Sequence, residues 1–457
     1  MSRPGLLLLL AACLAAPAAW AADPAAEALA AEALAAGAKA QRAGHPEEAL
    51  GHYVRCLELD PARVACWWEK GWSLWSQGDW PQVVTAWEQV ERLQPDHPEL
   101  GAWLPEARAH AAQLARLEAE VAAAPATTRA PVPAGATLRL RAVGDVMMGA
   151  DYPEPTLPPD DGATLLAAVT PLLQDADLTF VNLEGPLCDG GTTRKCRPDS
   201  EVCYAFRTPT RYGRHLQAAG VDLASTANNH AGDFGQTCRE QTEATLDALG
   251  IAWSGPPGTI GTATAGPFRV ALVAFHTSRS SNYVNDHAQA AELVAAAQAT
   301  HDLVVVSFHG GAEGSGALHV PDEMELFHEE ERGHLRAFAR AVVAAGADVV
   351  IGHGPHVPRG MEIVDGHLVA YSLGNFATYG RFNLSGHLGT SLVLEVVLDD
   401  AGRLVQGRIL PVRQRGRGVP EPDEEGRAIA LVRSLSQEDF PTTAPVIAAD
   451  GSFVPRP

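Results

Sequence analysis

The amino-acid sequence predicts an α/β domain that follows a small, all-α domain of helical repeats. From residue 138 onwards, short β-forming runs alternate with stretches of 3.6-residue apolar periodicity, a pattern typical of buried sheets covered by helices. Upstream, four positions recur 34 residues later, from Gly37 to Gly71 at the first of them, which indicates a repeated helix-turn-helix unit. The segment 124–137 between the two patterns is rich in proline and alanine and is typical of a linker.

The composition fits packed domains and argues against a nucleic-acid partner. The chain has 457 residues, of which 46% are hydrophobic, and this length favours more than one folded unit. Lys and Arg number 34 against 55 Asp and Glu, so the formal net charge is −21. This charge repels a polyanion, and no run of Lys or Arg offsets it. We therefore expect no nucleic-acid partner.

Residues 1–21 have the pattern of a secretory signal peptide. Arg3 precedes the apolar run Leu6–Leu10, and Ala19–Ala21 forms a small-x-small cleavage site. The apolar stretch is shorter than the ~20 residues of a transmembrane helix, and no later stretch could span a bilayer. The residues up to Cys13 also resemble a lipobox, which makes a lipid anchor the alternative. We favour cleavage after Ala21 and predict export to the periplasm or the cell surface.

Six cysteines remain after the leader, and an even number in an exported protein indicates disulfides. Cys56 and Cys66 flank the junction between the repeats, where a disulfide could staple a short stack. The other four could make two bridges, with the pairing left open. Zinc ligation is the competing reading, which the absence of a C-x-x-C pair disfavours. These four residues are Cys188, Cys196, Cys203 and Cys238.

The repeat has the 34-residue period of a tetratricopeptide repeat. Its small residues let paired helices approach, its aromatic residues fill the gap between them, and each proline ends a second helix. Because two repeats bury little core, we expect helices around Ala25–Ala36 and Glu99–Ala123 to cap a domain over residues 22–123. Such a module either binds a protein partner or acts as a spacer. The recurring positions are Gly37, Gly44, Tyr53 and Pro61, then Gly71, Gly78, Trp87 and Pro95.

The predicted α/β domain covers residues 138–413. Its expected strands are Leu138–Val143, Leu178–Asn182, Asp222–Thr226, Arg269–Phe275, Leu303–Phe308, Asp348–Ile351 and Leu368–Ser372. Its expected helices include Thr210–Ala219, Gln236–Leu249 and Gly333–Ala345. Beyond Arg417 the chain is acidic and then proline-rich, so residues 414–457 are predicted to form an irregular tail over the surface.

Polar or glycine-rich clusters follow almost every predicted strand. Because the carboxyl ends of strands in an α/β sheet share one edge, polar residues far apart in sequence should converge there. Carboxylate, amide and imidazole ligands suit Mn²⁺, Fe²⁺ or Zn²⁺, and a carboxylate can bridge two such ions. The converging residues are Asp145, Glu184, Asn229, His230, His309, His353 and His356.

Five motifs occur in a fixed order: G-D-x-M-x-G, N-L-E, A-N-N-H-x-x-D-x-G, G-H-x-P-H and Y-S-L-G-N-F. Over Leu138 to Val412 the chain resembles the CapA (poly-γ-glutamate capsule biosynthesis) family of calcineurin-like metallophosphatases. The resemblance implies a layered αββα sandwich that holds one or two divalent ions, Mn, Fe or Zn.

The resemblance also implies roles for single residues. His230 would be a proton donor or electrostatic stabiliser, and Asp145 is predicted with it as catalytic. Two departures from the pattern concern Met147, which replaces a histidine ligand, and Gly310 and Gly314, which replace aromatic residues. The implied metal ligands are Asp145, Glu184, Asn229, His309, His353 and His356. The implied substrate or supporting contacts are Asn228, Asp233, Glu313, Ser372 and Asn375.

The first functional hypothesis is a metal-dependent hydrolase that cleaves a phosphoester or amide bond with a metal-bound hydroxide. Its substrate would be an envelope polymer, with poly-γ-glutamate implied by the resemblance, or a small phosphoester or amide. The second hypothesis is a non-catalytic accessory protein that recruits a partner through the repeats and binds polymer through the α/β domain. A third is that the fold serves a different proton-transfer reaction on a peptide.

Overall fold

The structure is a computed structural model and describes residues 24–43, 45–123, 131–193, 195, 204–380 and 382–456. The predicted signal peptide with Cys13, residues 124–130 of the predicted linker, Gly44, Cys196 and Cys203 lie outside the described residues. The chain divides into two compact units, Met1–Arg108 and Ala109–Pro457. In the described ranges no helix combines the length and the apolar character that a membrane span requires.

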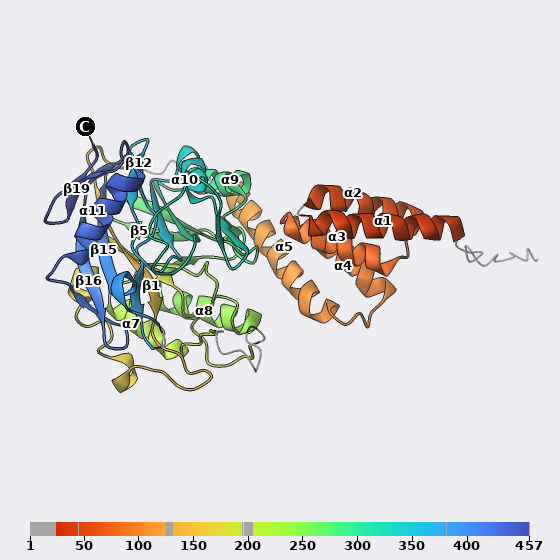
Figure 1. The fold of residues 1–457 in the computed structure, drawn as a ribbon, viewed down its shortest axis with the longest axis horizontal. Coiled ribbons are helices and arrows are strands. Elements are labelled where there is room, and N and C mark those ends of the chain that lie inside the picture. Colours follow the sequence, from red (N-terminus) through yellow and green to blue (C-terminus); the bar gives the residue numbers. More distant parts are fainter. Residues whose placement is uncertain are drawn as a thin grey trace, which may run out of the picture. The chain divides into compact units, whose positions relative to one another are not determined.

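The first unit is helical. It contains α1 (Pro24–Arg42), α2 (Pro46–Leu59), α3 (Val64–Ser76), α4 (Trp80–Leu93) and the beginning of α5 (Leu100–Ala123) (Figure 1). Two glycines predicted to allow close helix pairing do so. A Cβ atom on Gly37 would lie 2.5 Å from the Tyr53 ring, and one on Gly71 would lie 1.9 Å from the Trp87 ring. Each glycine therefore lets an aromatic side chain of the next helix pack against the backbone, while the tetratricopeptide assignment stays a prediction.

A disulfide and a tryptophan cluster reinforce this packing. Cys56 on α2 and Cys66 on α3 form a buried disulfide, as the sequence suggested. The fully buried Trp87 stacks on Trp68 with 5.1 Å between ring centroids, and its indole N–H donates to the carbonyl of Trp68. Aromatic burial and a covalent link thus stabilise a unit that is too small to rely on a large core.

Adding one methyl group at the glycine–tryptophan contact should therefore destabilise this unit. We expect Gly71→Ala to lower the free energy of unfolding by ~1–3 kcal/mol, because the Trp87 ring must move to make room. Intrinsic tryptophan fluorescence during urea unfolding is a suitable measurement, since seven of the nine tryptophans lie between Trp67 and Trp103.

Gly51→Ala is the matched control. Gly51 also lies in a helix, is exposed, and would place its Cβ in open space. Alanine there should leave stability unchanged or raise it by up to ~1 kcal/mol through helix propensity alone. Equal unfolding midpoints for the two variants would contradict the assigned role of Gly71.

The second unit contains two large sheets, both of which mix parallel and antiparallel pairs. Among the described residues the first sheet has ten strands, with β18-β19-β16-β15-β1-β2-β3-β4 in spatial order, β14 beside β1 and β17 beside β16. Its strands are β1 (Leu138–Met147), β2 (Leu178–Leu183), β3 (Leu223–Ser225), β4 (Ala252–Ser254), β14 (Asn375–Thr378), β15 (Thr390–Leu398), β16 (Leu404–Arg415), β17 (Val419–Pro422), β18 (Val446–Ile447) and β19 (Ser452–Val454).

The second sheet has seven strands in the described ranges, in the order β12-β13-β11-β8-β6-β5 with β7 beside β6. These strands are β5 (Gly261–Ala265), β6 (Phe268–His276), β7 (Asn282–Tyr283), β8 (Leu303–His309), β11 (Val349–His353), β12 (Met361–Val364) and β13 (His367–Ala370). A separate hairpin consists of β9 (Glu325–Phe327) and β10 (Glu330–Gly333). The helices of this unit are α6 (Thr170–Gln174), α7 (Gly213–Ala218), α8 (Gly235–Leu249), α9 (His287–Gln298), α10 (Leu335–Ala344) and α11 (Arg427–Asp439), with 3-10 turns at Pro159–Gly162, Thr210–Tyr212 and Gly386–Gly389.

The two sheets share one buried core, and helices cover their other faces. Leu140 and Phe180 from the first sheet lie in the same apolar cluster as Leu272 and Val305 from the second. Successive strand residues point to opposite faces, so the other side chains of these strands meet helices. α9 and α10 pack on the second sheet, whereas α6, α7 and α8 pack on the first. The unit is therefore a mixed α/β domain with α6 to α10 on the outer faces of the sheets, whereas α11 buries Ala428 and Val432 in the shared core.

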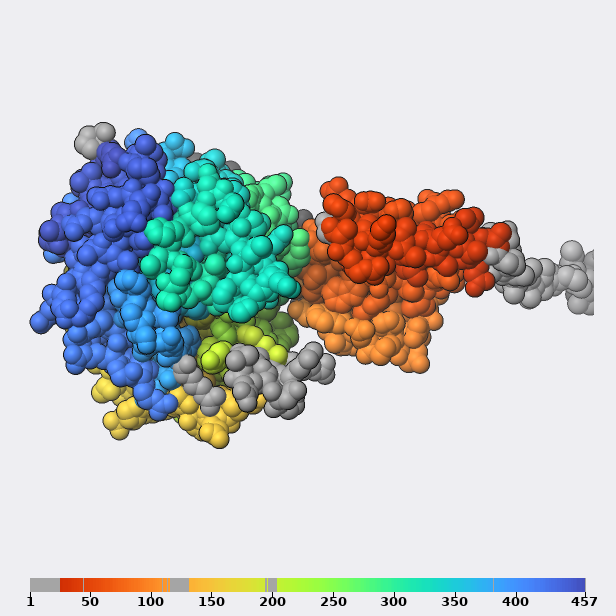
Figure 2. Space-filling view, viewed as in Figure 1, coloured from red at the N-terminus to blue at the C-terminus, as the bar shows by residue number. Residues whose placement is uncertain are grey.

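The predicted strands and the three predicted helices lie at or within a few residues of elements of the structure. The irregular C-terminal tail, in contrast, was wrong. β19 pairs with β16, where Gly407 leaves room for Phe453, and α11 buries Ala428, Val432 and Leu435. Figure 2 shows this segment, in dark blue, as a continuous part of the unit's surface. Acidic and proline-rich composition concealed an apolar helix face and two short strands that depend on pairing with β16.

Candidate metal centre

The carboxyl ends of parallel strands bring the predicted site residues together. In the first sheet Asp145 on β1 is in register with Asn182 on β2 and with Asn375 on β14. In the second sheet His309 on β8 is in register with His353 on β11. The turns that follow β2, β3 and β11 add Glu184, Asn229, His230 and His356. Residues separated by more than 200 positions therefore share one site.

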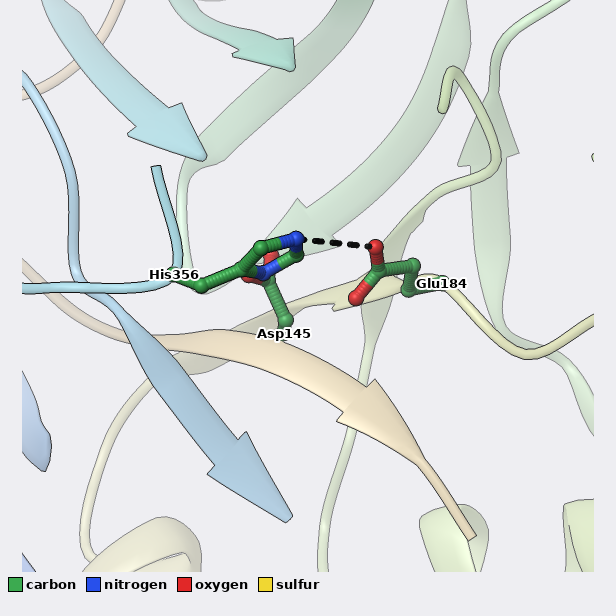
Figure 3. Close-up of side chains that lie close together, drawn as sticks. All are labelled: Asp145, Glu184 and His356. Atoms are coloured by element: carbon green, nitrogen blue, oxygen red, sulfur yellow. Dashed lines mark hydrogen bonds and ion pairs between the residues drawn. The ribbon is translucent and has the colours of Figure 1, made fainter. Parts of the chain in front are cut away.

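Glu184 lies at the centre of this cluster. Its Oε1 is 4.0 Å from Nε2 of His230, 3.9 Å from Nε2 of His309 and 3.9 Å from Nε2 of His356. Single ligand atoms of Asp145, Glu184 and His356 all lie within 4.8 Å of one another (Figure 3). The three distances from Glu184 are longer than hydrogen bonds and are within the span of about 4.4 Å that two ligands of one cation can reach when each lies about 2.0–2.2 Å from it.

Asp145 is fully buried and is held on three sides. His356 Nδ1 lies 2.9 Å from Oδ2, Asn182 Nδ2 donates to Oδ1 over 2.8 Å, and His353 Nδ1 lies 3.5 Å from Oδ1. Asn182 also lies 3.2 Å from Nδ1 of His309, so it links the two sheets. Asn182 was not among the predicted site residues, although it stands two residues before Glu184 in the N-L-E motif.

Several predicted ligand atoms are buried without a hydrogen-bond partner in the described part of the chain. They are both carboxylate oxygens of Glu184, Oδ1 of Asn229, Nε2 of His309 and Nε2 of His353. Buried polar atoms are nearly always satisfied, so such a concentration requires a partner from outside the protein. Their donor set of carboxylate, amide and imidazole fits a divalent Mn, Fe or Zn ion.

The charges of the site also fit a cation. Burial, and next the charge of Asp145, raises the pKa of Glu184 to about 8. Burial opposes the charged form of His356, but Glu184 and the contact with Asp145 raise its pKa to about 10. Burial holds the pKa of His309 well below its usual value, which favours the neutral imidazole that can bind a metal. Without added positive charge beside it, the carboxyl group of Glu184 therefore keeps its proton near neutral pH.

The side chain of Asp233 fixes the orientation of the His230 ring. Its Nδ1 lies 2.7 Å from Oδ2 of Asp233, which also accepts from the backbone N–H of Phe206. Lys195 Nζ lies 2.6 Å from the other oxygen of Asp233 and 3.1 Å from His230 Nδ1. The loop that supplies Lys195 is tied at its start by a disulfide between Cys188 and Cys238. No local pattern distinguishes Lys195, so the sequence analysis missed it.

The other residues predicted as substrate or supporting contacts differ in the hydrogen bonds and contacts that they make. Asn228 donates to the carbonyl of Leu183 and accepts from the N–H of His230, so it holds the turn. Ser372 accepts from the N–H of Gly374, which again supports a turn. Asn375 donates to a backbone carbonyl, while its Oδ1 is buried without a partner among the described residues. Glu313 faces the site, with Oε2 3.8 Å from Nε2 of His356.

Two more residues complete the surroundings. His276, at the end of β6, is in register with His309, and the two rings are 5.5 Å apart. Like His309, it ends a strand of the same sheet, a signal that could have found it. Met147 is buried with Ala150 and Phe206, and its sulfur accepts from the N–H of Gly149. Met147 is therefore part of the apolar packing around the site.

Comparison with known proteins places this domain in a family. Residues 139–379, more than half of the chain, match the family model described as "Bacterial capsule synthesis protein PGA_cap". The chain is similar to the PGA biosynthesis protein CapA of Bacillus subtilis, with 27% identity over 251 residues that cover 51% of this chain and 61% of that protein. It is also similar to the capsule biosynthesis protein CapA of Bacillus anthracis, with 26% identity over 260 residues, 52% of this chain and 59% of the relative.

A third relative is a probable polyglutamine synthesis accessory protein of Mycobacterium tuberculosis, 26% identical over 269 residues, 52% of this chain and 66% of the relative. The chain thus spans about three-fifths of the length of the relatives it matches. The matched segment contains every residue of the candidate metal centre, from Asp145 to Asn375. This chain belongs to the bacterial capsule synthesis protein family.

Proposed function

We propose that the chain is an exported, metal-dependent hydrolase that cleaves a phosphoester or amide bond of an envelope polymer. The observation that carries this proposal is the group of buried ligand atoms around Glu184 that have no hydrogen-bond partner in the described part of the chain. A structural role alone would not account for them, because unsatisfied buried carboxylate and imidazole groups are costly.

Each residue then has a defined part. Asp145, Glu184, Asn229, His309, His353 and His356 would hold one or two divalent ions. A bound ion of this type lowers the pKa of a coordinated water and polarises the bond to be cleaved. His230 presents Nε2 towards Glu184 while Asp233 holds Nδ1, so His230 can exchange a proton with the leaving group or stabilise a developing negative charge. Domain arrangement and site together favour a layered, metallophosphatase-like sandwich.

The relatives suggest the polymer. The names of two of them refer to capsule or PGA biosynthesis, which makes poly-γ-glutamate the first substrate to test. Export through the N-terminal signal peptide would place the site on the same side of the membrane as such a polymer. The helical repeats would then recruit a protein of the assembly machinery.

A second function, an accessory protein without catalysis, is favoured by one specific observation. Met147 stands where the phosphatase pattern has a histidine ligand, and it is committed to apolar packing. One relative is also named as a synthesis accessory protein. In that case the metal centre would be structural, and residues 22–123 would mediate the principal interaction.

Removal of the metal distinguishes the proposed hydrolase from the accessory protein. We expect the mature protein, purified without chelators, to contain about one or two equivalents of Mn, Fe or Zn. Chelation should abolish hydrolysis across a panel of phosphomonoesters, phosphodiesters and γ-glutamyl amides, and one of these metals should restore it. Elemental analysis and turnover are measured on the same samples. Bound metal with no turnover on any substrate would support the accessory protein, and failure to take up metal would refute the hydrolase.

A further inference from the structure

The mouth of the metal centre can be located from the exposure of its side chains. Asp145, Glu184, His309 and His353 are completely buried, whereas the side chain of His356 is 14% exposed and that of His230 is 8% exposed. Solvent therefore reaches the site past these two histidines, and a substrate must approach along the same side.

Two stacked phenylalanines border this opening. The Phe206 ring lies 4.4 Å from the His230 ring, and the Phe382 ring lies 6.4 Å from the His356 ring. The two phenylalanines stack on each other at 5.3 Å, with 21° between their planes. Tyr204 continues the row at 6.2 Å from Phe206 and is 49% exposed. We call Tyr204, Phe206 and Phe382 the aromatic wall.

The other neighbour of His356 is polar. Oε2 of Glu313 is 3.8 Å from Nε2 of His356. Nη2 of the buried Arg332 lies 2.8 Å from Oε1, the other carboxylate oxygen of Glu313. The opening therefore has an apolar border where the half-buried Phe382 stacks on the buried Phe206, the ammonium group of Lys195 3.1 Å from His230 Nδ1, and a charged pair next to His356. A substrate without an apolar surface, such as a bare carboxylate chain, would leave the aromatic wall uncovered.

We propose that the aromatic wall is a substrate subsite, which takes a ring with a flat apolar face, such as a sugar or an aryl group, attached next to the bond that the metal centre cleaves. This inference rests on the proposed hydrolase and favours a ring-bearing substrate over the poly-γ-glutamate that the names of the relatives suggest. Aromatic side chains bind such rings through stacking and apolar contact. Phe382 is the principal contact, because it is half-buried beside His356 and packs on Phe206 without belonging to the sheet core.

Binding of non-hydrolysable phosphonates to the full, Mn²⁺-loaded chain tests this proposal. Phenylphosphonate and methylphosphonate share the metal-binding group and differ in the ring, and calorimetry gives both dissociation constants. We expect the parent protein to bind phenylphosphonate about tenfold more tightly than methylphosphonate. Phe382→Ala should reduce this preference to about twofold or less and leave the affinity for methylphosphonate unchanged.

Two further variants test whether the preference for phenylphosphonate depends on the flat face of Phe382. Phe382→Leu keeps most of the apolar volume and the fold but removes the flat face, so it should lose part of the preference. Phe327→Ala removes a half-buried phenylalanine on the β9–β10 hairpin, whose ring lies against His328, and should keep the full preference. An equal preference in the parent and Phe382→Ala, no preference in the parent, or binding of neither compound would each overturn the subsite. Turnover is not needed here, so a protein that binds phenylphosphonate selectively yet hydrolyses nothing would refute the proposed function alone.

Discussion

Glu184→Gln should abolish stable metal binding. Glu184 Oε1 lies 3.9 to 4.0 Å from Nε2 of three different imidazoles, and neither of its carboxylate oxygens has a hydrogen-bond partner among the described residues. Glutamine keeps the shape but removes the negative charge that bridges the two halves of the site. We expect affinity for Mn²⁺ or Zn²⁺ to fall by about 100-fold or more, beyond the 10–100-fold typical of supporting residues around a metal.

Elemental analysis of the purified variant and calorimetric titration of the chelated protein measure this effect. The metal should also raise the unfolding temperature of the parent protein, but not that of the variant, because only a ligand that binds the native state stabilises it. Glu362→Gln is the control, since Glu362 is a buried glutamate that accepts from Tyr371 and Thr443 outside the site. Unchanged metal content in Glu184→Gln would rule out the assigned centre.

His230→Asn should remove turnover while the metal stays bound. His230 Nε2 points towards Glu184 from 4.0 Å, and Nδ1 is fixed by Asp233, an arrangement suited to proton transfer to or from a substrate. General acid–base catalysis typically contributes about 10²–10⁴-fold, so we expect kcat to fall by that factor. Asp233→Asn should lose less, because the imidazole remains but its orientation is no longer fixed.

Measuring the metal content of each variant distinguishes a loss of catalysis from a loss of metal binding. If His230→Asn loses both activity and metal, His230 is a ligand and not an acid–base residue. Full activity with metal retained would exclude any part for it in the reaction. His319→Asn is the control, since His319 is an exposed histidine that contacts Asp439 on the surface.

Much of the fold could be predicted because its signals are local. Apolar runs between helical stretches located β1, β2, β8 and β11. The rule that parallel strands share a carboxyl edge placed Asp145 beside Glu184 in the first sheet and His309 beside His353 in the second, and the packing of the two sheets on one core brings these pairs together. The glycine–aromatic pairs of the helical unit were likewise visible as a 34-residue period, and Gly71 does face Trp87. In each case the pattern can be recognised in the sequence without knowledge of the tertiary contacts.

The C-terminal segment shows where local signals fail. Residues 419–454 form three short strands, β17, β18 and β19, and the helix α11. β17 and β19 pair with β16, whose Gly407 leaves room for Phe453. Composition, which the prediction relied on, carries no information about that partner. Strands of two or three residues have too few side chains to show a period of their own.

The sequence by itself predicted which carboxylate, amide and imidazole ligands converge, in which order, and at which strand ends, although it did not reveal Asn182 or His276. Only the tertiary structure decided that Cys188 pairs with Cys238, that Lys195 contacts Asp233, and that Phe206 and Phe382 stack beside the opening. The physical reason is the difference between strands and loops. Strand ends are brought together by a repeating hydrogen-bond register, whereas loop residues meet through packing among segments that are distant in sequence, which no local periodicity encodes.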